Sequence, residues 1–406
     1  MRLLTISNGH GEDVIAAKIL QALQRLAPAA HLAGLPLVGE GGRYARLGID
    51  IVGPTQAMPS GGFIYMDGRE LWRDVRGGLL GLTGRQLQAV RQWGQGGGAV
   101  LAVGDIVPLI FGWLSGCPYS FVGTAKSDYY VRDEVGPYRG RRQASAPHPP
   151  TFYDPWDHWL MHRPACQGVF PRDRLTALAL QRRQIRAIDA GNPMMDGFEI
   201  PTEREVVAAV EGDLSVLLLP GSRVPEAYAN WGRILTAVPS LIEAYPSAQL
   251  LVAAAPALDA TVMGRPLSEQ GWQPVGPGCF QLNRATLTIS ASQFVAFAQQ
   301  ATVAIAMAGT ATEQFVGLGK PAITLPGSGP QFTPAFARAQ TRLLGSSVTL
   351  IDRPETAGQI LTAILSDPER RTQIYRNGRR RMGDPGAAER IAIQLLKWFG
   401  EDQRLD

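Results

Sequence analysis

Short apolar segments alternate with amphipathic segments along the whole chain of 406 residues. In the first half, apolar runs at residues 2–7, 35–38, 99–103 and 119–122 are separated by stretches with helical spacing, such as residues 14–26. Strands that alternate with helices in this way favour a parallel, doubly wound sheet. We therefore expect an α/β fold.

The same alternation begins again after a polar stretch with prolines at residues 192–202. Further strands are expected at residues 214–219, 250–254, 286–289, 303–306, 322–325 and 348–351. Because the chain is longer than one ordinary domain, we expect one domain over residues 1–196 and a second over 197–385. The remainder, 386–406, contains an amphipathic helix at 387–399 that is expected to cross back to the first domain.

Composition limits the class of protein. The net charge of +4 is modest for this length and does not indicate a nucleic-acid partner. Three cysteines far apart argue against a disulfide framework or a zinc site and favour a reducing cytoplasm. The N-terminal apolar segment is too short for a secretory signal. The apolar run at 99–116 is interrupted by Asp105 and Pro108, so we interpret it as strand, loop and helix rather than a membrane span.

Glycine-rich loops follow several of the expected strands, at the edge where open α/β sheets bind ligands. In the loop at 219–223, Gly221 allows close backbone approach, Ser222 can cap a helix, and Arg223 can reach a phosphate. The alternative is a loop that only caps the next helix.

A second loop carries Gly309, Thr310, Thr312 and Glu313, and it presents backbone N–H groups at a helix N-terminus where a diphosphate would fit. Glu313 could accept hydrogen bonds from a ribose, or it could be a helix N-terminal carboxylate without a ligand. Gln331 lies in a third glycine-rich loop, at residues 326–331.

The opening loop, residues 8–13, contains Asn8, Gly9, His10, Gly11, Glu12 and Asp13. Val14 stands where a dinucleotide-binding fingerprint needs its third glycine, and the loop is not a P-loop. Both nicotinamide oxidoreduction and P-loop hydrolysis lose support. The chain also has no Asp-x-Asp pair suited to a metal-bridged diphosphate and no clustered His or Cys, so we expect no metal and no cofactor.

The motifs at 219–223, 309–313 and 319–322 resemble lipid-A-disaccharide synthase in order and spacing over most of the chain. Residues 191–196, with Asn192, resemble that family's Gly-His-Pro-Leu-x-Asp, and Gly104-Asp105 resembles its strand-end aspartate region. A wider resemblance reaches the peptidoglycan N-acetylglucosaminyltransferase. Asn192 stands where the family has histidine, and the opening loop differs from its Ala-Gly-Glu-x-Ser-Gly-Asp.

The resemblance implies a GT-B fold, in which two Rossmann-like domains face a cleft. It implies that the second domain binds a UDP-sugar and the first an acceptor, with the opening loop and Asn192 on the acceptor side. The expected activity is inverting transfer of a hexose to a lipid-like acceptor, in glycolipid biosynthesis, by a cytoplasmic enzyme peripheral to the inner membrane. A homodimer is compatible with these expectations.

An inverting transfer needs a base that deprotonates the acceptor hydroxyl. Asp105 is the first candidate for this base. His10 is the second, because the peptidoglycan transferase has a histidine in its corresponding loop and an imidazole titrates near neutrality. A lone loop Asp or His can also be purely structural.

For the membrane surface, residues 71–93 combine Leu79 and Leu80 with Arg85, Arg91 and Trp93, a composition suited to an interfacial helix or to an ordinary packed helix. Two other functions remain open. One is a UDP-N-acetylglucosamine 2-epimerase of the same fold, although the Arg-Glu-x-Thr-x-Arg-Pro-Glu segment has no equivalent here. The other is a catalytically silent nucleotide-binding or scaffold protein.

Overall fold

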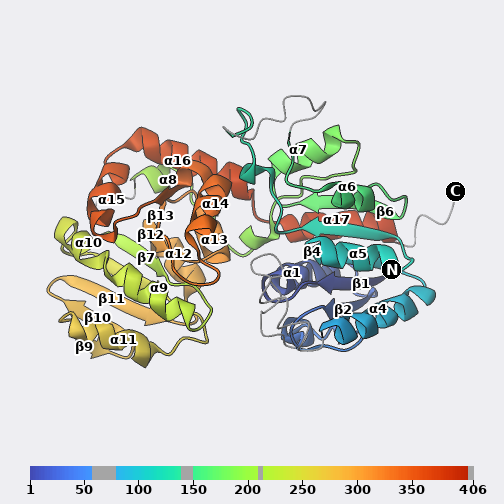
Figure 1. The fold of residues 1–406 in the computed structure, drawn as a ribbon, viewed down its shortest axis with the longest axis horizontal. Helices are drawn as coiled ribbons and strands as arrows, with labels where there is room; N and C mark the ends of the chain where they lie inside the picture. The colour runs from blue at the N-terminus through green and yellow to red at the C-terminus, as the bar shows by residue number, and fades with distance from the viewer. Residues whose placement is uncertain (57–78, 139–149, 209–213, 401–406) are drawn as a thin grey trace. The chain divides into compact units, whose positions relative to one another are not determined.

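The chain divides into two compact units (Figure 1). The computed structural model describes residues 1–56, 79–138, 150–208 and 214–400. Unit 1 comprises Met1–Asp196 together with Gly383–Asp406, and unit 2 comprises Gly197–Met382. Each unit contains its own sheet with helices on both faces, which confirms the predicted pair of doubly wound α/β sheets.

Unit 1 contains a six-stranded parallel sheet in the order β3-β2-β1-β4-β5-β6. Its strands are β1 (Arg2–Ser7), β2 (His31–Pro36), β3 (Asp50–Ile51), β4 (Ala99–Gly104), β5 (Tyr119–Gly123) and β6 (Cys166–Pro171). The chain builds outward from β1 to β3 and then returns to the other side of β1 with β4. The point between β1 and β4 is therefore the topological switch point, where such sheets bind ligands.

The two faces of this sheet are covered by different helices. Alternate strand residues point to opposite faces, so Leu3 packs with α1 (His10–Leu26) and α17 (Ala387–Phe399). Leu4 points the other way, to the face covered by α4 (Leu79–Gln95), α5 (Ile106–Leu114) and α6 (Pro155–Met161). The other α-helices described in the unit are α2 (Gly42–Arg46) and α7 (Arg174–Arg182).

Unit 2 contains an eight-stranded sheet in the order β14-β13-β12-β7-β8-β11-β10-β9. Its strands are β7 (Ser215–Leu219), β8 (Gln249–Ala253), β9 (Gln273–Gly276), β10 (Cys279–Leu282), β11 (Ala285–Ser290), β12 (Val303–Ala306), β13 (Ala322–Thr324) and β14 (Val348–Leu350). The sheet is parallel except for β10, which pairs antiparallel with both β9 and β11 near one edge. Its switch point lies between β7 and β12.

The helices of unit 2 enclose a buried core on one face that includes Trp231, Leu241 and Leu361. The α-helices described in this unit are α8 (Glu203–Ala208), α9 (Glu226–Leu235), α10 (Val238–Ala244), α11 (Ala260–Glu269), α12 (Phe294–Gln300), α13 (Thr310–Gly317), α14 (Pro334–Leu344), α15 (Ala357–Leu365) and α16 (Pro368–Met382). Of these, α9, α10, α11, α14 and α15 contribute to that core. At the basic end of α16, Arg379 and Arg381 donate to backbone carbonyls of Gly317 and Leu343.

The carboxylate of Asp196 caps the N-terminus of α17. It accepts hydrogen bonds from the backbone N–H groups of Gly386 at 2.6 Å, Ala387 at 3.0 Å and Ala388 at 2.8 Å. A carboxylate at a helix N-terminus also interacts favourably with the helix dipole. Asp196, the last residue of the first segment of unit 1, therefore holds α17, which belongs to the second segment.

Two local expectations need correction. Residues 139–157 are rich in Pro, Arg, Ser and Ala, a composition that predicts a mobile surface loop. The stretch is not a loop throughout, because Asp154 and Asp157 form a capping box at the start of α6; residues 139–149 lie outside the described residues. In the expected interfacial stretch, residues 71–78 and the side chains of Leu79 and Leu80 also lie outside the description. Trp93 is buried in the core beneath α4, so it is not an interfacial side chain.

Candidate functional site

The loops after β1 and β4 meet at the switch point of unit 1. Gly104 ends β4 with φ +139°, and a Cβ there would lie 3.1 Å from Cγ of Asn8. A side chain at this position would therefore be strained and would crowd the first loop. Glycine lets the two loops approach, so the start of α1 and the start of α5 lie beside each other.

Glu12 lies in the first turn of α1 and points toward the end of β5. Its carboxylate accepts a hydrogen bond of 3.3 Å from the hydroxyl of Thr124. Burial raises the pKa of the Glu12 carboxyl to about 7, and the neighbouring negative charge of Asp105 acts in the same direction. Glu12 can therefore hold or release a proton near neutral pH.

Asp105 is buried and is the N-cap of α5. Its Oδ1 accepts a 2.9 Å hydrogen bond from the backbone N–H of Val107. Asp105 thus has a structural role as a helix cap, and its role as a base stays a prediction. His10 is the first residue of α1, and its side chain lies outside the description.

The rest of the opening loop supports the start of α1. Asp13 is buried and accepts a 2.5 Å hydrogen bond from the hydroxyl of Ser7, which also contacts the Tyr44 hydroxyl. Gly9 is the N-cap of α1, and Gly11 lies in its first turn. Asp13 therefore fastens the loop to the end of β1, while Glu12 is the carboxylate directed toward the end of β5.

Asn192 lies beneath this site. It is buried, and its Oδ1 accepts from the backbone N–H of Met194 at 3.0 Å, while its Nδ2 has no hydrogen-bond partner among the described residues. Asn192 shares a cavity of about 10 Å³ with Thr124 and Arg172. A guanidinium nitrogen of Arg172 donates to the Thr124 carbonyl oxygen at 3.1 Å, which supports the partner of Glu12 from behind.

In unit 2, the loops after β7 and β12 meet in the same way. Gly221 has φ +97°, and a Cβ there would lie 3.1 Å from the carbonyl oxygen of Met307. Glycine is therefore needed for the loop of residues 220–225 to lie against the loop that leads into α13. The helix α13 begins at this point, and the N–H groups of its first turn favour the binding of an anion.

Three buried polar side chains fasten the loops of unit 2 to one another. Glu226 accepts from the backbone N–H of Phe332 at 2.6 Å, and Asn230 donates to the carbonyl oxygen of Pro220 at 3.1 Å. Gln340 donates to the carbonyl oxygen of Ala308 at 2.9 Å. These three residues were not predicted from the sequence, because each bond joins residues that lie ten or more positions apart in the chain.

The predicted donor-side residues lie on these loops with different exposures. Ser222 and Thr310 are exposed, Gly309, Arg223 and Gln331 are half-buried, and Glu313 is buried in the first turn of α13. Thr312 donates its hydroxyl to the carbonyl oxygen of Ala308 at 2.6 Å, which gives it a structural role. Ser222 does not cap α9, because that helix begins at Glu226 and its N-cap is Pro225.

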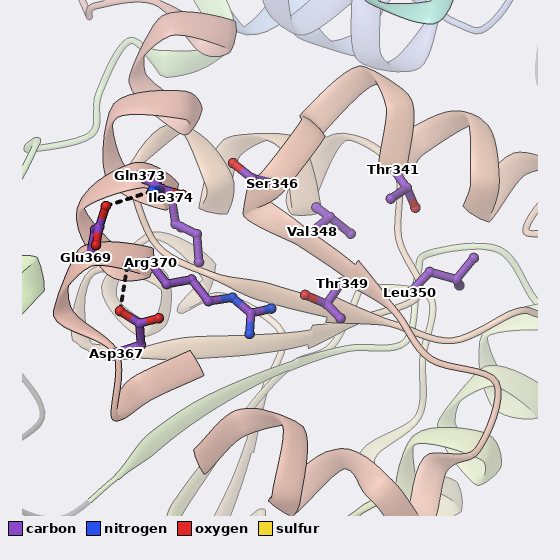
Figure 2. Close-up of a pocket in the computed structure, with 10 residues that line it drawn as sticks. All are labelled: Thr341, Ser346, Val348, Thr349, Leu350, Asp367, Glu369, Arg370, Gln373 and Ile374. Atoms are coloured by element: carbon purple, nitrogen blue, oxygen red, sulfur yellow. Dashed lines mark hydrogen bonds between the residues drawn. The ribbon is translucent and has the colours of Figure 1, made fainter. Parts of the chain in front are cut away.

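A separate cavity of about 650 Å³ lies at the outer edge of unit 2 (Figure 2). It is bordered by the edge strand β14, at Val348 and Leu350, and by the start of α16, where Arg370 extends across it. This cavity is three strands from β7 in the order of the sheet. It is therefore distinct from the loops at the switch point.

No protein-family model and no curated protein matches this chain. Solved structures do match it. The chain resembles the UDP-GlcNAc 2-epimerase from Neisseria meningitidis bound to UDP-GlcNAc, with a TM-score of 0.56 and 13% identity over 98% of this chain and 100% of the other. It also resembles Acinetobacter baumannii MurG, with a TM-score of 0.55 and 12% identity over 98% and 99% of the two chains.

A third similar structure is CalG4, the calicheamicin glycosyltransferase, with a TM-score of 0.61 and 14% identity over 98% of both chains. These likenesses extend over both units, and they define the class of protein: the fold is GT-B, which glycosyltransferases and UDP-GlcNAc 2-epimerases share. At such identities the fold alone is shown, so the likeness does not select between those two activities.

Two features are absent from the part of the chain that the structure describes. No helix there is both long and apolar enough to cross a bilayer. No group of three or more His, Cys, Asp or Glu side chains is arranged to hold a metal ion within that same part of the chain.

Proposed function

We propose that the protein is an inverting, metal-independent glycosyltransferase that transfers a hexose from a UDP-sugar to a hydroxyl group of a lipid-like acceptor. The observation that carries the proposal is the pair of carboxylates, Glu12 and Asp105, at the switch point of unit 1. The equivalent point of unit 2 instead presents the backbone N–H groups of α13. One unit thus suits a base, and the other suits an anion.

On the acceptor side, the base is Glu12, whose pKa is raised by burial and, to a smaller extent, by the negative charge of Asp105. The acceptor oxygen attacks the anomeric carbon, the bond from that carbon to the diphosphate oxygen breaks, and the hydroxyl proton passes to Glu12. A base with a pKa of about 7 matches this task, because a general base is most effective when its pKa lies near the working pH. Asp105 and His10 remain the alternatives.

On the donor side, Gly221, Arg223, Gly309 and Thr310 lie around the diphosphate, and Glu313 accepts hydrogen bonds from the ribose. Helix N-terminal amides stabilise the negative charge that develops on the departing UDP. The exposed Ser222 and the half-buried Gln331 lie on flanking loops and complete the set. The likeness to a structure bound to UDP-GlcNAc supports the choice of a uridine nucleotide.

The acceptor class rests on the sequence resemblance to lipid-A-disaccharide synthase. We propose that Asn8, Gly9, Gly11 and Asn192 line or support the acceptor side, and that the protein works at the cytoplasmic face of the membrane as a peripheral enzyme. The departures at Asn192 and in the opening loop favour an acceptor different from that of the family.

The second candidate function is a UDP-GlcNAc 2-epimerase, which is supported by structures of that activity among the similar folds. A carboxylate pair could also exchange protons with a sugar. The two functions differ in one requirement, because an epimerase converts its nucleotide sugar without any acceptor.

The test is a screen of UDP-, GDP- and dTDP-sugars with and without total membrane lipid, read by mass spectrometry. The transferase predicts free UDP and a glycosylated lipid only when donor and lipid are both present. Conversion of UDP-GlcNAc to its 2-epimer in the absence of lipid would establish the epimerase instead. No change of any sugar nucleotide would favour the silent binding protein.

Three variants assign the base: Glu12→Gln, Asp105→Asn and His10→Ala. Glu12→Gln is expected to lower the transfer rate about 10²–10⁴-fold, the usual contribution of a general base, while the affinity for UDP is unchanged. If Glu12→Gln retains transfer and Asp105→Asn loses it, Asp105 is the base. If only His10→Ala loses it, the base is His10.

A further inference from the structure

Three tryptophans are exposed side by side on unit 1. The exposed fractions of the side chains are 38% for Trp113, 58% for Trp156 and 45% for Trp159. Trp93, Trp231 and Trp272 are buried, as tryptophans usually are. Among the described residues, the large hydrophobics that are exposed include these three tryptophans, and all three lie on the neighbouring helices α5 and α6.

The three side chains and Arg163 form one surface, which we call the tryptophan patch. Trp113 and Trp159 stack edge to face, with ring centroids 5.1 Å apart. Trp156 and Trp159 are three residues apart on α6, so they lie on the same side of that helix. The guanidinium carbon of Arg163 lies 3.6 Å above the Trp159 ring.

The patch is held rigidly, so its exposure is not a sign of a loose segment. The capping box of Asp154 and Asp157 fixes the start of α6, and the Tyr119 hydroxyl donates to the Leu160 carbonyl oxygen at 2.7 Å. Leu160 and Met161 are buried in the core on the opposite side of the helix. The fold therefore presents Trp156 and Trp159 to solvent at fixed positions.

Basic side chains outnumber acidic ones around the patch, because Lys126, Arg163, Arg182 and Arg183 stand against Asp154 and Asp157. The carboxylates of Asp154 and Asp157 are both paired with the buried ammonium of Lys126. His162, at the end of α6, contacts the carbonyl oxygen of Arg183 at 2.9 Å, which brings the end of α7 beside the patch. That end carries Arg182 and Arg183, so arginines border the tryptophans on this side.

We infer that the tryptophan patch is a docking surface for an anionic lipid bilayer. Tryptophan favours the bilayer interface, where its ring is buried among lipids while its N–H remains near water. Arginines beside it attract anionic headgroups. A bilayer accounts for both the aromatic and the basic side chains, whereas a soluble acidic partner accounts only for the arginines.

The geometry also relates this surface to the proposed acceptor site. α5 begins beside Asp105 and carries Trp113 near its other end, about 12 Å away at the rise of an α-helix. A bilayer on the patch would lie within reach of a lipid acceptor bound near Asp105. The inference rests on the proposed function only in this relation, because bilayer binding itself requires no sugar transfer.

The experiment is co-sedimentation of the full chain with two kinds of vesicle, pure phosphatidylcholine and an equal mixture of phosphatidylcholine and phosphatidylglycerol, without any donor. Wild type should bind the anionic vesicles and bind the neutral ones at least about tenfold more weakly. Tryptophan fluorescence should shift to the blue only with the anionic vesicles. Failure of wild type to bind the anionic vesicles would overturn the inference.

The variants are Trp156→Ser alone and Trp156→Ser with Trp159→Ser, and the matched control is Val275→Ser with Val295→Ser, two exposed apolar residues of unit 2. The tryptophan variants should lose at least about tenfold in vesicle affinity while the control binds like wild type. Equal binding by the double tryptophan variant would contradict the inference. Affinity for UDP, measured in parallel, should be the same in all of them, so a failure of bilayer docking is distinguishable from a failure of the nucleotide site.

Discussion

The hydroxyl of Thr124 donates its hydrogen bond to the carboxylate of Glu12, and so joins the end of β5 to the first turn of α1. This bond favours the ionised carboxylate, but burial and the charge of Asp105 outweigh it, and the pKa of Glu12 rises above its usual value of 4.5 to about 7. The first prediction follows from that balance.

Glu12 should make the stability of the protein depend on pH. Its pKa is higher in the folded state than in the unfolded state, so between about pH 4.5 and 7 the folded state binds more protons and stability falls as the pH rises. Glu12→Gln removes the ionised group, and it should stabilise the fold at pH 8 by at most about 3 kcal/mol. Near pH 4, where the carboxyl is protonated in both states, variant and wild type should melt alike.

Thermal unfolding of both proteins from pH 4 to pH 8 checks this prediction. The difference in melting temperature isolates Glu12, because all other titrating groups are shared. A difference that does not change with pH would show that the carboxyl does not titrate in this range.

Glu313→Ala should weaken UDP binding about 10- to 100-fold, the usual effect of losing hydrogen bonds to a charged group. Isothermal calorimetry measures the affinity, with Glu269→Ala as a matched control, because Glu269 is exposed at the end of α11. Glu313 is buried, so Thr310→Val, at an exposed position of the same turn, provides a variant less prone to misfold. Unchanged affinity in both variants would place the nucleotide elsewhere.

Asp196→Ala should destabilise unit 1 by about 1–2 kcal/mol, because three backbone N–H groups of α17 lose their acceptor. Urea unfolding measures the loss. Glu389→Ala, in the first turn of the same helix and paired with the exposed Arg25, should change stability by less than about 0.5 kcal/mol. Equal effects of the two substitutions would mean that the helix dipole, rather than the cap, accounts for the stabilisation.

Sugar transfer should continue in a metal chelator. The sequence has no Asp-x-Asp pair, and we propose that helix amides and Arg223 supply the positive potential that a metal supplies in other transferases. The measurement is the transfer rate with and without chelator. Complete loss that magnesium or manganese restores would contradict the proposed mechanism.

Much of the fold was predictable because periodicity reports burial. β12 and α17 have the bounds that the apolar pattern predicts, and the interrupted run at 99–116 is indeed a strand followed by a helix. The pattern missed β6, whose apolar run is broken by Gln167 and Gly168, and the exposed hairpin of β9 and β10. Strands with little apolar alternation leave no periodic signal.

The candidate site was less predictable, because its chemistry depends on contacts across the sheet. Nothing local distinguishes Glu12 from Asp13, yet one faces Thr124 and the other is held by Ser7. An arginine-rich segment does not by itself indicate a phosphate site, since Arg379 and Arg381 donate to backbone carbonyls. Of the two exposed tryptophans on α6, Trp156 lies within residues 139–157, for which the sequence predicts a surface loop.

The cap that Asp196 forms on α17 has a consequence for how the two units of this chain can be separated or exchanged. A Cβ on Gly383 would lie 3.4 Å from the Cα of Gly191, so the chain leaves unit 1 and re-enters it at nearly the same place. Unit 2 is therefore a domain inserted at a single point of unit 1. Insertions with adjacent ends are the kind that domain exchange tolerates. Joining residues 196 and 383 through a short linker should give a unit 1 that folds without unit 2. The same junction should accept a nucleotide-binding domain from another protein in place of unit 2.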